Sequence, residues 1–84
     1  MRLDRYLKLA RVIRRRTVAR EFCDQGRVKV NEHLAKASHQ VAPGDVLTVD
    51  FGYKTTRFKV LELPVPGAAR ETPPYETLSE WKPT

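Results

Sequence analysis

Residues 14–31, RRRTVAREFCDQGRVKVN, combine a run of arginines, a short amphipathic helix, a glycine stop and the start of a strand. Thr17 is the predicted N-cap of a helix over 17–25, because its hydroxyl can accept a hydrogen bond from a free backbone N–H of the first turn. Gly26 ends this helix in our prediction, since glycine takes the left-handed C′ conformation without a Cβ clash. One apolar stripe has helical spacing: Val18, Ala19, Phe22 and Cys23.

A strand is predicted directly after the glycine. Val28 and Val30 alternate with Arg27 and Lys29, and an alternation of period two is typical of a strand with one buried face. The two cations therefore leave on the face opposite the valines. Residues 31–33 follow as a turn, because Asn31 tolerates the left-handed region.

On the N-terminal side, residues 2–10 predict a first helix. Its apolar positions recur at i, i+3, i+4 and i+7: Leu3, Tyr6, Leu7 and Ala10. Asp4 falls in the first turn, where a negative charge favours the helix dipole. Residues 11–16 are predicted as a linker that turns Val12 and Ile13 inward, although the periodicity also permits one continuous helix through residue 16.

On the C-terminal side, an irregular polar segment over 34–39 leads to a Pro43–Gly44 turn. Two strands are predicted beyond it, 46–51 and 55–63, the second being the last of the sheet. The predicted core contains Leu3, Leu7, Phe22, Val28, Val30, Leu47 and Val49, with Tyr6 as an anchor between the helices and Cys23 as a small core hydrophobe.

Residues 64–84 hold five of the six prolines and few aliphatic side chains. We expect an extended or partly disordered tail there. Tyr75, Leu78 and Trp81 are spaced by three, which predicts a short helical turn that docks on the domain or on a partner. The predicted fold is thus α+β, with two short N-terminal helices packed on a small, mostly antiparallel β-sheet and a Pro-rich C-terminal tail.

The charge is unevenly distributed along the 84 residues. Residues 1–36 carry eleven Lys/Arg against four Asp/Glu, a net charge of +7, whereas residues 37–84 carry a net charge of −1. A basic module of this kind is typical of a nucleic-acid binder. No apolar run reaches the roughly 20 residues of a membrane span, and the first residues resemble no signal peptide. We therefore expect a cytoplasmic protein without membrane contact.

The sequence gives little support for catalysis. Ser38 and His39 are neighbours, and neighbours on an extended chain point to opposite faces, which disfavours a nucleophile–base pair. His33, His39 and the single cysteine, Cys23, form no recognisable metal-ligand set. We predict a protein that is not an enzyme and has no catalytic residues, no metal and no cofactor.

Five short motifs occur in order: R-L-D-x-Y-L (2–7), R-R-R-T-x-A (14–19), G-R-V-x-V-N (26–31), K-A-S (36–38) and P-G-D-x-L (43–47). Together they resemble the S4 RNA-binding domain, also called the αL-type fold, over residues 1–63. Residues 64–84 then form the tail. The stand-alone length and the tail are similar to the bacterial ribosome-quality-control protein P (RqcP) group, which is related to the heat-shock protein 15 group.

This resemblance implies a protein that binds a stalled large ribosomal subunit carrying a peptidyl-tRNA. It implies contacts to 23S rRNA and tRNA, and help for a partner that recruits alanyl-tRNA for C-terminal alanine tailing. We expect a monomer. Two alternatives stay open: a stand-alone S4 targeting module for an RNA-modifying enzyme acting in trans, and a DNA-binding protein. Glu21 and Asp24 on the exposed side of the second helix disfavour DNA, because they would repel its phosphates.

Arginine forks match phosphate oxygens, and RNA is recognised through its shape, phosphates and 2′-hydroxyls. We predict one basic face built from two helices and a strand. For Asn31 the alternative is turn geometry alone, and for Arg20 it is an i,i+4 pair with Asp24. Arg2 and Arg16 match the family motifs most closely. The predicted RNA-binding residues are Arg2, Arg5, Lys8, Arg14, Arg15, Arg16, Thr17, Arg20, Arg27, Lys29, Asn31, Lys36 and Ser38.

Overall fold

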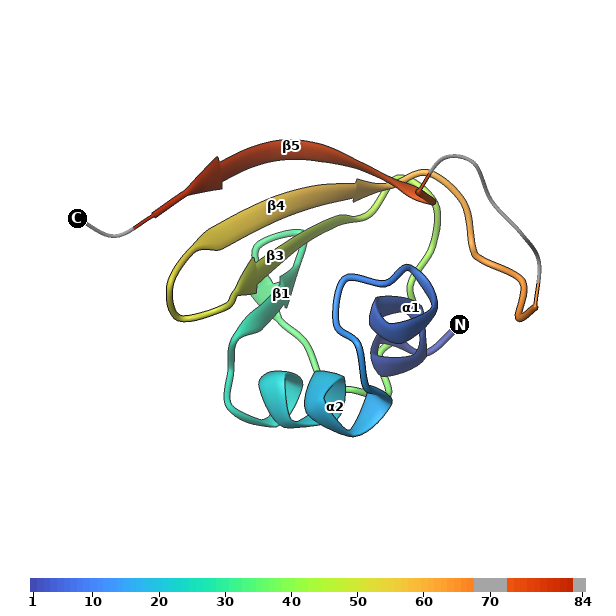
Figure 1. Ribbon diagram of the computed structural model, residues 1–84, viewed down its shortest axis with the longest axis horizontal. Coiled ribbons are helices and arrows are strands. Elements are labelled where there is room, and N and C mark those ends of the chain that lie inside the picture. The colour runs from blue at the N-terminus through green and yellow to red at the C-terminus, as the bar shows by residue number, and fades with distance from the viewer. Residues whose placement is uncertain (68–72, 83–84) are drawn as a thin grey trace.

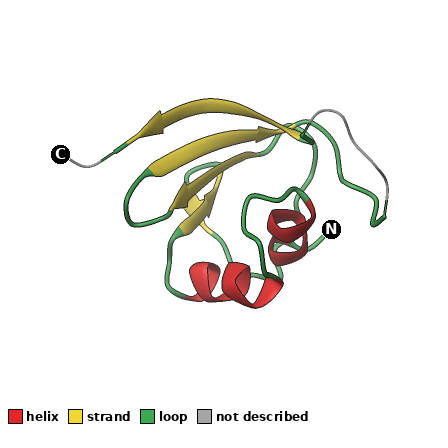
Figure 2. Ribbon diagram, in the orientation of Figure 1, coloured by secondary structure: helices red, strands yellow, loops and turns green. Residues whose placement is uncertain are grey.

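Two helices lie on one side of a five-stranded sheet in the computed structural model, which describes residues 1–67 and 73–82 (Figure 1). The elements are α1 (Leu3–Leu9), α2 (Arg16–Asp24), β1 (Val28–Val30), β2 (His33–Leu34), β3 (Val46–Asp50), β4 (Thr55–Val60) and β5 (Tyr75–Trp81). The strand order is β2-β1-β3-β4-β5 with antiparallel neighbours throughout. The predicted α+β architecture is confirmed (Figure 2).

The core fills the space between the helices and the sheet. Strand alternation sends one set of side chains toward α1 and α2: Val28, Val30, Leu47, Val49, Phe58 and Val60. Leu3, Tyr6 and Leu7 of α1 meet them and are fully buried. Within the described residues, no helix is long and apolar enough to cross a membrane.

Helix α1 ends because Arg11 adopts the left-handed conformation, with φ of 62°. The backbone N–H of Val12 then donates to the carbonyl of Leu7 at 3.0 Å, which closes a Schellman turn around the helix end. A continuous helix through residue 16 is therefore wrong. The predicted linker is confirmed, with Ile13 buried and Val12 half-buried.

Helix α2 begins one residue earlier than predicted. Arg15 is extended, with φ of −119° and ψ of 137°, and makes no side-chain capping bond, so Thr17 is not the N-cap. Thr17 is instead the second residue of the helix, and Arg16, the first, lies with Nε 3.4 Å from Asp4 of α1. The predicted C-terminus is confirmed: Gly26 has φ of 74°, and the N–H of Arg27 donates to the carbonyl of Phe22 at 2.9 Å.

The turn at 31–33 is also confirmed. Asn31 and Glu32 have φ of 51° and 70°, the left-handed pair of a tight hairpin between β1 and β2. The Asn31 side chain additionally accepts a hydrogen bond from the Val46 N–H at 3.0 Å and donates to the Asp45 carboxylate at 3.2 Å. Its amide thus fastens the hairpin to the start of β3.

The C-terminal segment differs from the prediction. The predicted strand over 55–63 ends at Val60 and is not the last, because residues 75–81 form β5 along β4 instead of a helical turn. A β-bulge between Arg57 and Phe58 shifts the register, so the apolar spacing no longer follows a period of two. The part of the tail prediction that concerns residues 68–72 and 83–84 lies outside the described residues.

Candidate nucleic-acid interface

The start of α1 is bonded to a loop that follows β2. The N–H of Leu3 donates to the His39 carbonyl at 2.8 Å, and the N–H of Asp4 donates to the Ala37 carbonyl at 3.2 Å. These loop carbonyls satisfy N–H groups that the first turn of a helix leaves without intrahelical partners. The same bonds bring the K-A-S motif beside the R-L-D motif, although more than 30 residues separate them.

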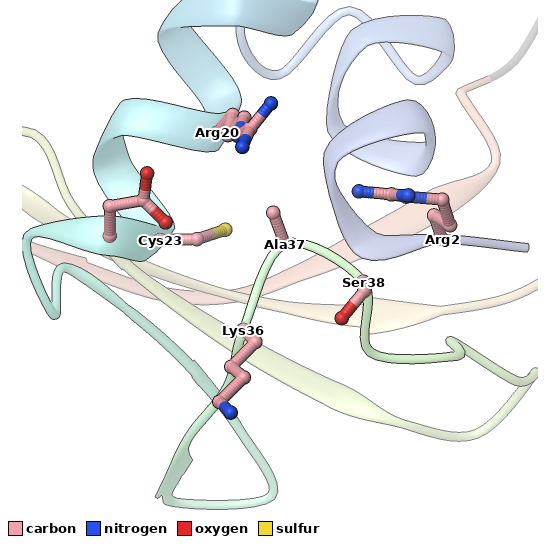
Figure 3. A pocket seen from close by; sticks show the side chains of 7 residues that line it. Arg2, Arg20, Cys23, Lys36, Ala37 and Ser38 are labelled. Carbon is pink, nitrogen blue, oxygen red and sulfur yellow. The ribbon is translucent and has the colours of Figure 1, made fainter.

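An open hollow of about 410 Å³ forms where this loop meets the two helices. We call it the basic hollow, and it is lined by Arg2, Arg20, Cys23, Asp24, Lys36, Ala37 and Ser38. Arg2 and Arg20 flank Ala37 from α1 and α2, with their guanidinium groups directed into the space between the helices (Figure 3). Lys36 extends from the loop in another direction (Figure 3).

Asp4 is buried and contacts two arginines: Arg2, which lines the basic hollow, and Arg16, which is not among the lining residues. The Asp4 side chain is 2% exposed, yet it accepts hydrogen bonds from Arg2 Nε at 3.2 Å and from the Arg5 N–H at 2.8 Å. Arg16 Nε lies 3.4 Å from its other carboxylate oxygen. Burial alone raises the pKa of Asp4, but the hydrogen bonds from Arg16, the Arg5 backbone and Arg2 outweigh it, and the pKa is held below the usual 3.8.

Cys23 forms part of the floor of the basic hollow. It is buried, and burial, with the nearby carboxylates of Asp4 and Asp24, raises the pKa of its thiol to about 11. The thiolate is the reactive form of cysteine, so a thiol held protonated behaves as a small hydrophobe. Its burial among core residues agrees with the prediction made from the sequence.

Five further residues predicted as RNA ligands, four cations and one hydroxyl, are near the lining residues in sequence but do not line the basic hollow. Arg5 and Lys8 are exposed on α1, Arg14 and Arg15 are exposed in the linker, and Thr17 is exposed in the first turn of α2. These exposed cations add positive charge to the first 15 residues of the chain, which attracts a polyanion.

The remaining predicted residues, Arg27, Lys29 and Asn31, lie elsewhere. The guanidinium of Arg27 lies over the Phe22 ring, 5.2 Å from its centroid. Lys29 alternates with buried Val28 and Val30, so it leaves on the sheet face opposite the core and the helices. Asn31 fastens the β1–β2 turn. The single face predicted from two helices and a strand is therefore wrong for Lys29, because strand alternation points it away from the hollow.

Sequence reasoning missed the role of Asp4. Its place in the first turn suggested a helix-dipole effect, whereas the structure makes it the shared acceptor of two arginines. The available signal was its position inside the R-L-D-x-Y-L motif, next to Arg2. A buried carboxylate is stable only when it is paired and hydrogen-bonded, which accounts for an acid inside a basic surface.

The fold, with two helices on one side of an antiparallel sheet, agrees with the S4 class of RNA-binding domains, and a family model supports this class. The S4 domain model matches residues 1–47, and the chain belongs to the S4 domain family. A relative from Bacillus subtilis (strain 168), named RQC P-site tRNA stabilizing factor, is 56% identical over 63 residues, which are 75% of this chain and 73% of that protein. A Helicobacter pylori (strain 26695) protein of the same name is 31% identical over 76% of each chain.

A solved structure has the same architecture. The trimeric Heat Shock Protein 15 of Vibrio cholerae superimposes with a TM-score of 0.77 at 25% sequence identity, over 94% of this chain and 82% of that one. The S4 resemblance inferred from the five motifs is thus confirmed, as is its connection to both groups of proteins.

Proposed function

We propose that this protein binds stalled large ribosomal subunits, contacts 23S rRNA and a peptidyl-tRNA, and stabilises that tRNA during ribosome quality control. The observation that carries the proposal is the basic hollow, where Arg2, Arg20 and Ser38 converge from three separate parts of the chain. The names of its relatives, RQC P-site tRNA stabilizing factor, support the tRNA and ribosome assignments.

The proposal includes a non-enzymatic, binding role. The bound protein assists a partner that recruits alanyl-tRNA, and so supports C-terminal alanine tailing of the nascent chain. It acts as a monomer, in contrast to the trimer named for the Vibrio cholerae structure. Because bacterial ribosomes work in the cytoplasm, this function implies a cytoplasmic location.

Rigid arginine forks suit this task. A guanidinium offers parallel N–H donors to two phosphate oxygens, and its plane can stack on an exposed base. A-form RNA presents phosphates and 2′-hydroxyls across a wide, shallow groove that side chains can reach. The exposed arginines and Ser38 supply donors for both groups.

Sedimentation of the tagged protein through a sucrose gradient of bacterial lysate tests the proposal. We expect wild type in the large-subunit fraction and Arg2→Ala/Arg16→Ala at the top of the gradient. The matched control, Lys29→Ala/Lys59→Ala, removes the same charge from exposed strand positions and should sediment like wild type. Wild type at the top, while still binding structured RNA, would favour a targeting module acting in trans. Preference for duplex DNA over structured RNA would favour the DNA-binding alternative.

A further inference from the structure

We propose that Asp4 is a positioning residue for RNA binding, which holds Arg2 and Arg16 as a paired clamp for phosphate groups. This inference rests on the proposed RNA-binding role of the basic hollow. It assigns a task to an acidic residue that would be expected to weaken the binding of a polyanion.

The contacts of Asp4 use both of its carboxylate oxygens. Oδ1 accepts from Arg2 Nε at 3.2 Å and from the Arg5 N–H at 2.8 Å, while Oδ2 lies 3.4 Å from both Arg2 Nη2 and Arg16 Nε. Arg2 precedes α1 and Arg16 begins α2, so one buried carboxylate joins the start of both helices. A charge-assisted network of this kind fixes the orientation of its members.

Both arginines nevertheless remain half-exposed, at 44% and 47% of their side chains. The close contact to Arg16 is made by Nε, the nitrogen nearest the chain, while 47% of the side chain stays exposed. A side chain already held in place loses less conformational entropy when it binds a ligand. Asp4 therefore holds Arg16 by its inner nitrogen and Arg2 by one edge of its guanidinium, Nε and Nη2, and so prepares both side chains for phosphate.

The sign of one substitution separates this role from a purely structural or electrostatic one. Asp4→Asn keeps the shape of the side chain and removes a negative charge from the basic surface. Electrostatics alone then predicts tighter RNA binding, because the protein becomes more positive. Loss of positioning predicts weaker binding, since two arginines must be ordered by the RNA itself.

The experiment measures the dissociation constant of the full chain for a fluorescently labelled RNA stem–loop by anisotropy. We expect Asp4→Asn to weaken binding about tenfold, the effect of releasing two long side chains. Glu21→Gln is the matched control: it removes a negative charge from an exposed position of α2 that is not among the lining residues of the hollow, and we expect unchanged or slightly tighter binding. Equal or tighter binding by folded Asp4→Asn would overturn the proposal.

A double-mutant comparison then shows whether Asp4 acts through the arginines. In the Arg2→Ala/Arg16→Ala background, Asp4→Asn should cause no further loss, and a further tenfold loss would overturn the proposal. If the double-arginine variant itself binds like wild type, the proposed site fails, which is a separate result from failure of the Asp4 inference.

Charge-preserving variants cover the case in which Asp4→Asn does not fold. Arg2→Lys/Arg16→Lys keeps both positive charges but removes the Nε donors and the planar forks. We expect weaker binding than wild type at each salt concentration, together with a salt dependence close to that of wild type, because the charge is unchanged. Wild-type affinity in this variant would show that charge suffices and would overturn the proposal.

Discussion

The hydroxyl of Tyr6 donates a buried hydrogen bond to the backbone carbonyl of Pro74, 3.0 Å away and 68 positions later in the chain. The same carbonyl accepts from the N–H of Leu61 at 3.0 Å. Pro74 is buried and directly precedes β5, so α1, the end of β4 and the start of β5 meet at one peptide group. The N-terminal helix and the C-terminal strand are thereby held together through the core.

Tyr6→Phe is expected to lower the free energy of unfolding by about 1 kcal/mol, the usual net contribution of a buried hydrogen bond. The ring continues to fill its place in the core, so packing should be retained. Urea denaturation measures the change. Tyr53→Phe deletes the same atom from an exposed side chain and should leave the midpoint unchanged. Equal midpoints for all three proteins would show that the Tyr6 bond contributes no stability.

Removal of residues 64–84 tests the proposed domain boundary. We expect residues 1–63 to unfold cooperatively but at a lower temperature than the full chain. The truncation removes β5 and with it the Tyr75 ring, whose centroid lies 4.8 Å from that of the Phe58 ring. RNA affinity should change little, since all the described residues that line the basic hollow lie within positions 2–38. Calorimetry and RNA titration check both statements, and loss of the cooperative transition would place the C-terminal strand inside the folding unit.

Asp4→Asn should also make the free energy of unfolding depend less on pH in the acid range. The pKa of Asp4 is lower in the folded protein than the usual 3.8, so its carboxylate stabilises the fold above that value. This contribution is lost as the pH falls through the folded pKa. We expect the stability difference between wild type and Asp4→Asn to be constant near neutral pH and to shrink below about pH 4. A difference that stays constant throughout acid titration would contradict the hydrogen-bonded carboxylate.

Substitutions at the C-terminal ends of the two helices are expected to change the stability of the protein in opposite directions. Gly26→Ala should destabilise the protein by about 1 kcal/mol, because a Cβ is strained at φ of 74°. Arg11→Gly should stabilise it by about 0.5 kcal/mol, the strain relieved at φ of 62° less the extra backbone entropy of glycine. Thermal unfolding of both variants measures this. Stability changes of the same sign would show that backbone strain does not govern these ends.

The effect of an exposed cation on RNA binding should depend on whether it lies in the basic hollow or on the sheet face opposite the helices. Arg20→Ala removes a charge from the basic hollow and is expected to weaken binding several-fold, by roughly 1 kcal/mol. Lys29→Ala removes a charge from the opposite sheet face and should have a much smaller effect. Titration of a structured RNA with each variant at one salt concentration measures the difference. An equal loss for both would indicate an interface that includes the outer face of the sheet.

Local chemistry in the sequence determined most of the elements. Periodicity located both helices and β1, β3 and β4, and Gly26 marked the end of α2, because these features depend on neighbouring residues. Five ordered motifs identified the S4 family, and the charge difference between the two parts of the chain indicated a polyanion partner. Arg2, Arg20, Lys36 and Ser38 were predicted as RNA ligands, and the structure brings them to one hollow.

Only the tertiary structure decided which of these residues share a face and what holds them. Backbone hydrogen bonds from Leu3 and Asp4 to the loop at 37–39 join motifs that are distant in sequence. The periodicity of the sequence does not predict hydrogen bonds between such distant residues. Asp4 reads locally as a helix-dipole residue and becomes a buried acceptor only when the second helix delivers Arg16. Likewise, β5 forms because β4 has an edge with which it can pair. The β-bulge between the two strands interrupts the alternation of apolar and polar residues by which a strand is predicted from sequence. Long-range hydrogen bonds and register, unlike local propensity, are set only when the chain is folded.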